Sequence, residues 1–346
     1  MVIINLIVEK FKKYVIIVSI SLVKTEETDL LYFYIALGVI ALSAIIGVAV
    51  MLRITVPISK KVYLDTLVRN SPDKWKRECS CPTNEEQLEM WNVGCAWAEE
   101  HKDRMREVSI ENDGLKLVGE LYDFGTDKCV IILPGRCESL MYSYYYARPY
   151  GEMGISVFLP DPRSHGNSEG TYSTLGVCEG KDTNAWARYL NEKEGMKQIY
   201  LHGVCVGAST SIFAATDENM PQCIKGMVNE GCYVNFYETF KNHMIADGHP
   251  VFPVCGMVMR QVKKHTGQDI MKKCPLNYVG KVKIPVLFIF GEKDIYTVPE
   301  KSKKLFAACG SEDKKLVWFP EGGHSHLRIN NTEDYDNAVK EFITTH

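Results

Sequence analysis

The sequence predicts an α/β protein with a mostly parallel, twisted sheet, helices on both faces and a transmembrane helix in front of it. Three observations lead to this fold class. An uncharged stretch occupies residues 30–52, two strand-like runs flank an Asp-Gly turn, and a series of short apolar runs follows at intervals of helical length. This order of elements is typical of one α/β domain behind a membrane anchor.

The bulk composition excludes several partner classes. The chain has 346 residues and a formal net charge of -3, which gives no reason to expect a nucleic-acid partner. Its 12 cysteines are scattered without Cys-x-x-Cys spacing, unlike a disulfide framework or a zinc ribbon. We therefore expect reduced, mostly buried thiols, with no metal and no cofactor.

The stretch at 30–52, LLYFYIALGVIALSAIIGVAVML, is predicted to be a single transmembrane helix. At about 1.5 Å per residue it is long enough for a hydrocarbon core of about 30 Å. The run at 14–23 resembles a signal peptide without a small-residue cleavage site, so residues 1–29 receive no role. Basic residues after the helix, beginning with Arg53, Lys60 and Lys61, favour a cytosolic C-terminal domain.

Residues 53–105 are predicted to be a helical connector, and residues 106–346 the catalytic domain. At its start, REVSIEN and LKLVGELYDF flank Asn112-Asp113-Gly114, which indicates an antiparallel hairpin. Short, wholly apolar runs then suit parallel strands buried on both faces. These runs lie at 129–135, 155–161, 198–203, 223–231, 284–294 and 315–324.

An insertion at about 232–280 has no strand pattern and is rich in aromatic residues and methionine. Such side chains make adaptable pocket walls, so a helical cap over the site is one interpretation. Ordinary core-facing helices are equally consistent with this composition. We expect the partner to be a small-molecule acyl substrate of apolar character.

The first candidate catalytic residue is Cys205, in the pentapeptide Gly203-Val204-Cys205-Val206-Gly207 between a predicted strand and a predicted helix. A sharp strand-to-helix turn needs small flanking residues such as Gly203 and Gly207. A thiol at a helix N-terminus has a lowered pKa, which makes it a competent nucleophile. The alternative is a buried structural cysteine beside chance glycines.

Asp294 and His324 supply an acid and a base at later strand ends. Asp294 ends the run VLFIFGEKD, where Glu292 is its competitor. His324 ends LVWFPEGGH, and His326 is an alternative base. A His-x-His metal site is a further possibility, but no third ligand with matching spacing follows. The order nucleophile, acid, histidine is the one that α/β-hydrolases use.

From about residue 106 onward, the chain resembles α/β-hydrolases of the serine aminopeptidase-like and dipeptidyl-peptidase-like group, some of them membrane-anchored. The stretches VIILPGR, LPDPRSHGNSEG, LHGVCVGAS, FIFGEKDIYTVP and PEGGHSH carry the resemblance. It implies the α/β-hydrolase fold. It also implies that Asp161 and Arg163, in the Asp-x-Arg-x-x-Gly-x-Ser-x-Gly loop, form an internal ion pair that shapes the site.

The chain departs from this family at two places. Pro134-Gly135 replaces the usual His-Gly, and Cys205 stands where serine is commoner. Dienelactone hydrolases also have a cysteine at this position. The main-chain amides of Arg136 and Val206 are still expected to form the oxyanion hole.

These residues predict acyl transfer through a thioester, on a carboxylic ester or thioester substrate. A catalytically silent binding protein and an acyltransferase that uses the same residues are the two alternatives.

Overall fold

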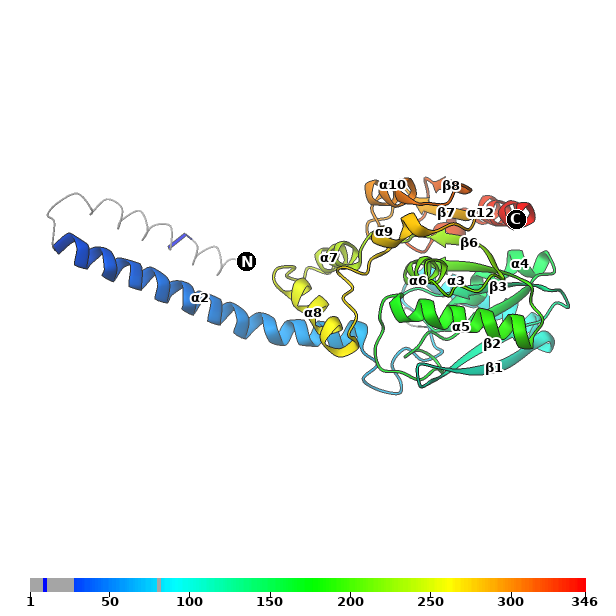
Figure 1. Cartoon of the computed structure of the whole chain (residues 1–346), viewed down its shortest axis with the longest axis horizontal. Coiled ribbons are helices and arrows are strands. Elements are labelled where there is room, and N and C mark those ends of the chain that lie inside the picture. The colour runs from blue at the N-terminus through cyan, green and yellow to red at the C-terminus, as the bar shows by residue number, and fades with distance from the viewer. Residues whose placement is uncertain (1–8, 11–27, 80–81) are drawn as a thin grey trace. The chain divides into compact units, whose positions relative to one another are not determined.

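The computed structural model describes residues 9–10, 28–79 and 82–346 and divides the chain into two compact units, residues 1–58 and 59–346 (Figure 1). The run at 14–23 that resembles a signal peptide lies outside the described residues. The two units are considered separately below.

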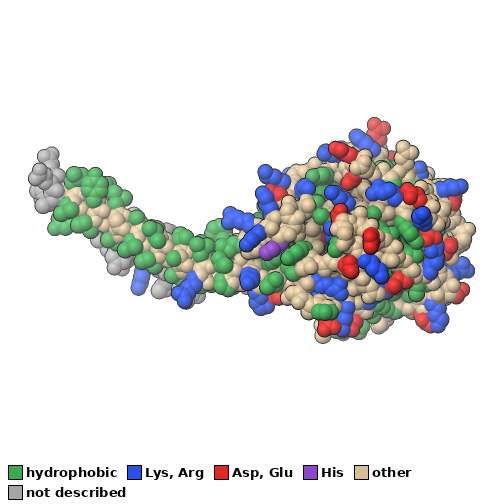
Figure 2. Space-filling model, turned by 60° about the horizontal axis from the view of Figure 1, so that its bottom comes forward, with side chains coloured by type: hydrophobic (Ala, Val, Ile, Leu, Met, Phe, Trp, Pro, Cys, Tyr) green, Lys and Arg blue, Asp and Glu red, His purple; other side chains and the backbone are tan. Residues whose placement is uncertain are grey.

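The first unit contains most of helix α2 (Thr28–Leu67), which continues into the second unit. The helix is longer than the predicted span of 30–52, and its most apolar window has a mean hydropathy of 2.8. Its side chains between residues 30 and 52 are almost all hydrophobic and exposed, whereas both signs of charge mix on the surface of the second unit (Figure 2). The helix is long enough to cross a bilayer, and its apolar, exposed surface suits contact with lipid.

The region predicted as a helical connector, 53–105, has several parts. It contains the end of α2, an irregular segment, α3 (Glu85–Glu100) and the short 3-10 helix η1 (Lys102–Arg104). Asn84 caps α3, since its side chain accepts a hydrogen bond from the amide of Gln87 at 3.0 Å. Because the second compact unit begins at Ser59, part of this region folds with the catalytic domain.

The second unit is built on an eight-stranded sheet in the order β1-β2-β4-β3-β5-β6-β7-β8. Strands β1 and β2 form the predicted antiparallel hairpin, β2 is antiparallel to β4, and the remaining neighbours are parallel. The α/β fold with a mostly parallel sheet is therefore confirmed. The strands are β1 (Met105–Asn112), β2 (Leu115–Tyr122), β3 (Lys128–Leu133), β4 (Ser156–Pro160), β5 (Gln198–Val204), β6 (Ile224–Glu230), β7 (Val286–Gly291) and β8 (Lys314–Phe319).

Helices cover both faces of this sheet, and successive residues of β5 show the two layers. Leu201 belongs to the core shared with α5 (Val177–Lys193) and α6 (Val206–Ala215). His202 points to the opposite face, where its ring nitrogens lie 2.9 Å from the Tyr150 hydroxyl and 3.0 Å from the Tyr335 hydroxyl. Outside the insertion at about 232–280, the other helices of this unit are η2 (Leu140–Tyr146), α4 (Arg148–Glu152), η3 (Val279–Lys281), α10 (Pro299–Ala308), α11 (Leu327–Asn330) and α12 (Thr332–Thr345).

The insertion predicted at about 232–280 forms α7 (Phe236–Ala246), α8 (Val254–Thr266) and α9 (Pro275–Tyr278). Phe236, Phe240 and Met244 of α7 are buried. They therefore pack into the interior. The polar side of α7, with Asn242, lines a small cavity beside the loop after β7.

The register of the parallel strands brings their carboxyl ends together. Leu133 of β3 pairs with Gly203 of β5, and Val204 of β5 pairs with Glu230 of β6. Since the chain leaves β3 and β5 at the same edge, the loops after these strands lie side by side. This edge is where open α/β sheets place their functional groups.

Candidate active site

The turn between β5 and α6 places Cys205 at the N-terminus of α6 in a conformation that few side chains adopt. Its backbone has φ 54° and ψ -107°. A residue held in such a sparsely populated backbone region costs about 1–3 kcal/mol. A Cβ on Gly203 would lie 2.2 Å from the carbonyl oxygen of Gly207, and one on Gly207 would lie 2.0 Å from that of Leu133. The two glycines are thus required by contacts between main chains.

Asp294 and His324 meet at the end of the sheet. His324 Nδ1 lies 2.7 Å from Asp294 Oδ2. The other carboxylate oxygen, Oδ1, accepts hydrogen bonds from the amides of Tyr296 at 2.9 Å and Thr297 at 2.8 Å. The Thr297 hydroxyl also donates to Oδ2. The carboxylate is therefore fixed in position from three sides.

Electrostatics couples the histidine to both neighbours. Burial alone lowers the pKa of His324, but the Asp294 carboxylate and then the Cys205 side chain outweigh burial and raise it well above its usual value. Burial raises the pKa of Asp294, yet His324 and Thr297 hold it at about 2. This arrangement favours an imidazolium between two groups that carry or can carry negative charge.

The second ring nitrogen of His324, Nε2, is buried and has no hydrogen-bond partner within the described parts of the chain. Because Nδ1 is occupied by Asp294, Nε2 is the nitrogen available to Cys205. In the neutral ring, Nε2 can accept a proton from a thiol, and this transfer gives the imidazolium that Asp294 and Cys205 favour. Gly231 lies beside the ring with φ 58°, a backbone conformation that favours glycine, whereas a Cβ there would be in ordinary contact with His324 Cε1 at 3.4 Å.

The competitors of these residues lie elsewhere. His326 turns away, with Nε2 2.8 Å from Gln87 Oε1 and Nδ1 3.0 Å from Glu86 Oε2. Glu292 is exposed. In residues 28–79 and 82–346, no group of three His, Cys, Asp or Glu side chains gathers as a metal site would.

The amides of Arg136 and Val206 follow the neighbouring strands β3 and β5, the first in the loop after β3 and the second at the start of α6. Each follows by three residues a member of the Leu133–Gly203 pair. Neither amide donates a hydrogen bond to any part of the chain that the structure describes. Two free amides beside Cys205 are suited to an oxyanion.

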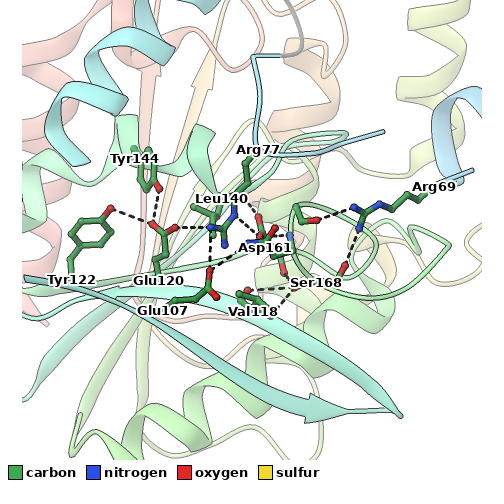
Figure 3. Close-up of polar contacts among 12 residues, drawn as sticks. Arg69, Arg77, Glu107, Val118, Glu120, Tyr122, Leu140, Tyr144, Asp161 and Ser168 are labelled. Atoms are coloured by element: carbon green, nitrogen blue, oxygen red, sulfur yellow. Dashed lines mark hydrogen bonds and ion pairs between the residues drawn. The ribbon is translucent and has the colours of Figure 1, made fainter. Parts of the chain in front are cut away.

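The predicted ion pair between Asp161 and Arg163 is wrong. Asp161 Oδ2 instead accepts from Arg77 Nε at 2.9 Å, and Arg77 also donates to Glu120 at 2.9 Å (Figure 3). Arg163 donates two hydrogen bonds of 2.6 Å to Asp182 in α5. The two side chains diverge because each finds a partner on a different element.

Asp161 nevertheless shapes the loops around the site. Its carboxylate accepts from the amide of Leu140 at 2.9 Å and from that of Asn167 at 2.8 Å. Burial raises its pKa, and Arg77 opposes that rise. Asp161 thus joins the loop after β3, its own loop and the segment between α2 and α3 (Figure 3).

Sequence analysis missed two side chains on the loop after β3. The Glu138 carboxylate accepts from the amide of Gly135 at 2.7 Å, and burial raises its pKa to about 7. The side chain of Arg136 is partly buried, and its Nη1 donates to Cys137 Sγ at 3.5 Å. No local pattern marks either of them, because only the main chain of this loop belongs to the recognised motif.

Helix α7 of the insertion reaches the site through an aromatic stack. The ring of His243 lies 3.7 Å from that of Tyr296 at an angle of 12°, and Tyr296 meets the His324 ring edge-on at 5.7 Å. Burial, followed by the charge of Arg136, lowers the pKa of His243 to about 3. This histidine is therefore neutral and packs over the site.

Comparison with known proteins agrees with this architecture. The serine aminopeptidase S33 family model matches residues 257–330, a segment that includes Asp294 and His324. The protein YqkD of Bacillus subtilis is 25% identical over 224 residues, which cover 63% of this chain and 72% of YqkD. The uncharacterized membrane protein YNL320W of Saccharomyces cerevisiae is 23% identical over 56% of this chain and 62% of its own length.

Among solved structures, the esterase Pf2001 of Pyrococcus furiosus superposes with a TM-score of 0.60. It is 23% identical, and the match covers 72% of this chain and 93% of the esterase. This likeness shows the fold, and the family model and the relatives add the sequence relationship. Together they show the α/β-hydrolase fold for this chain and a similarity to the serine aminopeptidase S33 family over residues 257–330.

Proposed function

We propose that this protein is a membrane-anchored hydrolase that cleaves a carboxylic ester or thioester through Cys205, His324 and Asp294. The single observation that carries the proposal is the His324 ring, held by Asp294 at 2.7 Å while its other nitrogen is buried and bare. An unpaired buried nitrogen costs free energy, so a structural role alone does not explain it. A proton acceptor for Cys205 does.

The first half of the reaction forms a thioester. His324 Nε2 accepts the thiol proton, and the Cys205 sulfur attacks the substrate carbonyl carbon. The amides of Arg136 and Val206 donate hydrogen bonds to the oxygen as it becomes negative. The intermediate then collapses, the bond to the leaving oxygen or sulfur breaks, and the leaving group takes the proton from His324.

The second half restores the enzyme. His324 Nε2 takes a proton from water as the water oxygen attacks the thioester carbonyl. The bond to the Cys205 sulfur then breaks, the carboxylic acid leaves, and the sulfur recovers the proton. Because a thiolate leaves more readily than an amide nitrogen, esters and thioesters suit this nucleophile better than amides do.

The anchor is part of the proposal. The apolar helix at the N-terminus is long enough to cross a bilayer, and Arg53, Lys60 and Lys61 follow its apolar part. Basic residues flanking a span favour the cytosolic side, so we place the catalytic domain there. Protease protection in sealed vesicles tests the side, since a cytosolic domain is cut only when the cytosolic face is exposed.

The function is tested by intact-mass measurement of the full chain in detergent after brief exposure to p-nitrophenyl acetate. We expect one acetyl adduct on the wild type, none on Cys205→Ala and slow labelling of His324→Ala. Cys95→Ala and His326→Ala are the matched controls and should label like the wild type. Cys95 and His326 have the same chemistry but lie away from the Asp294–His324 pair.

Equal labelling of Cys205→Ala would reject the nucleophile and favour a binding protein. An adduct that persists in water but transfers to an added amine would favour the acyltransferase. Release of acetate with turnover in water supports the hydrolase.

A further inference from the structure

Residues 68–78, called the strap below, follow α2 and lie before the region that resembles known hydrolases, yet they are bound to the loop after β4. The hydrogen bonds are Arg69 N to Thr171 O at 2.7 Å, Arg69 Nη1 to Ser168 O at 3.0 Å, Arg69 Nη2 to Gly166 O at 2.9 Å and Gly166 N to Trp75 O at 2.8 Å. Trp75 also stacks on the His165 ring, with the ring centres 4.4 Å apart. The strap is therefore folded as part of the catalytic domain.

Arg77 extends these contacts to η2, the 3-10 helix that continues the loop after β3. Arg77 Nε donates to Asp161 Oδ2 at 2.9 Å, and the other oxygen of Asp161, Oδ1, accepts from the amide of Leu140 at 2.9 Å (Figure 3). Leu140 is the first residue of η2. Because the Asp161 side chain is buried, its charge depends on Arg77 as a counter-ion. One carboxylate thus links Arg77 to the beginning of η2.

A second carboxylate links Arg77 to the end of η2. Arg77 Nη1 donates to Glu120 Oε1 at 2.9 Å, and Glu120 Oε2 accepts from the Tyr144 hydroxyl at 2.6 Å (Figure 3). Tyr144 belongs to the last turn of η2. Since Glu120 and Asp161 are both buried and contact one guanidinium, removal of this cation would leave two like charges close together. The Arg77 guanidinium therefore fixes both ends of η2.

The position of η2 in turn decides where the loop after β3 lies. This loop, residues 134–139, begins at a strand of the sheet and ends at η2. The Arg136 amide, the expected oxyanion donor, lies between these two attachments. The Cys137 Sγ adds a weak contact to the Thr66 carbonyl oxygen of α2 at 3.6 Å. A shift of η2 therefore moves the loop, because only one end of the loop belongs to the sheet.

We propose that Arg77 is a positioning residue of the oxyanion hole. It fixes η2 through Asp161 and Glu120, and η2 sets the place of the Arg136 amide relative to Cys205. This inference rests on the proposed function and deepens it, since it assigns the support of the oxyanion loop to a residue outside the recognised motifs. The machinery of the reaction then begins in the strap and not at residue 106, where the resemblance to known hydrolases starts.

The test compares two reactions of the Cys205 thiol in the full chain in detergent. Acylation by p-nitrophenyl acetate passes through an oxyanion, which the two amides stabilise. Alkylation by iodoacetamide displaces iodide from a saturated carbon and forms no oxyanion. Mass spectrometry of the peptide that contains Cys205 gives both initial rates, and circular dichroism shows that each variant is folded. The readout is the ratio of the acylation rate to the alkylation rate, which a change in the thiolate fraction leaves unaltered.

We expect Arg77→Met to lower this ratio about tenfold to hundredfold, as displacement of an oxyanion donor does. Arg77→Lys keeps the charge but loses the planar fork that reaches both carboxylates, so its ratio should lie between those of Arg77→Met and the wild type. Arg163→Met is the matched control, because it also removes a buried cation from a carboxylate. The partners of Arg163 are Asp182 and Asp113, which lie outside η2. This variant should keep the wild-type ratio.

A wild-type ratio in a folded Arg77→Met protein would overturn the proposal, and so would an equal fall in Arg163→Met. If Arg77→Met does not fold, the ratio of Arg77→Lys decides in the same way. A wild-type Cys205 that is alkylated but never acylated rejects the hydrolase instead. Hydrogen exchange of residues 134–146 then decides, since faster exchange in the Arg77 variants than in Arg163→Met supports positioning by Arg77 and equal exchange refutes it.

Discussion

Replacing Gly207 with alanine places a methyl group where the main chain of β3 already lies. The added Cβ would be 2.0 Å from the carbonyl oxygen of Leu133 and 2.8 Å from that of Pro134. To reach ordinary van der Waals contact, the atoms at Leu133 must separate by more than about 1 Å. A main-chain carbonyl at the end of a buried strand cannot rotate away as a side chain can.

The expected cost follows from this overlap. Overpacking a core costs about 1–3 kcal/mol, occasionally more, even when flexible side chains absorb the strain. Here the Leu133–Gly203 strand pair must move, so we expect Gly207→Ala to lose at least about 3 kcal/mol of the free energy of unfolding. Helix propensity predicts the opposite sign, a gain of about 1 kcal/mol. The sign of the change therefore decides between the two effects.

The assay is urea unfolding of the full chain in detergent micelles, followed by circular dichroism. Gly256→Ala in α8 is the matched control, because a Cβ there meets nothing within 4 Å. It should gain about 0.5–1 kcal/mol. Ester turnover by Gly207→Ala should also fall about a hundredfold, since the shift moves the oxyanion loop relative to Cys205.

A Gly207→Ala protein that gains stability as Gly256→Ala does would refute this reasoning. The loop after β3 would then lie farther from the elbow. The inference that the Arg136 and Val206 amides form one oxyanion hole would then also fail.

Three further predictions concern charges around the site. Asp294→Asn should cost about 2 kcal/mol at pH 7, because the folded pKa of about 2 lies below 3.8. This stabilisation is present above pH 3.8 and is lost as the pH falls through about 2. The unfolding curves of the wild type and the variant should therefore differ at pH 7 and converge at about pH 2. The folded pKa of Glu138 is raised from 4.5 to about 7, so the stabilisation from its neutral form is present below pH 4.5 and lost as the pH rises through 7. Between about pH 5 and pH 8 the free energy of unfolding should therefore fall less for Glu138→Gln than for the wild type. Arg77→Met leaves the buried Asp161 without its cation and should lower the free energy of unfolding by about 3–5 kcal/mol. Arg106→Met, which breaks the exposed pair with Glu194, should cost under about 1 kcal/mol. Equal shifts in melting temperature would contradict the network in Figure 3.

Much of the fold follows from local patterns in the sequence. The hairpin around Asp113 and the short apolar runs each report the burial of their own strand, and a parallel sheet has few alternatives once helices separate the runs. The positions of Cys205, Asp294 and His324 at strand ends follow in the same way. Each candidate lies where an apolar run stops, and the open edge of such a sheet collects these ends.

Partners of charged side chains are a different kind of information. The family resemblance implied a local ion pair between Asp161 and Arg163, which are two residues apart. In the fold, Asp161 is buried among amides and meets Arg77 from the segment between α2 and α3, while Arg163 meets Asp182 of α5. Spacing could not reveal this, since the choice depends on which distant elements pack against the loop.

The same limit explains why the side chain of Arg136 escaped sequence analysis. A motif assigns this position to the oxyanion hole through its main-chain amide, which any side chain tolerates. Its guanidinium donates to Cys137 Sγ at 3.5 Å, a contact that only the folded loop reveals. Such contacts depend on how the loop after β3 packs against elements that are distant in the sequence. Tertiary packing therefore sets the surroundings of this side chain, and no sequence motif marks them.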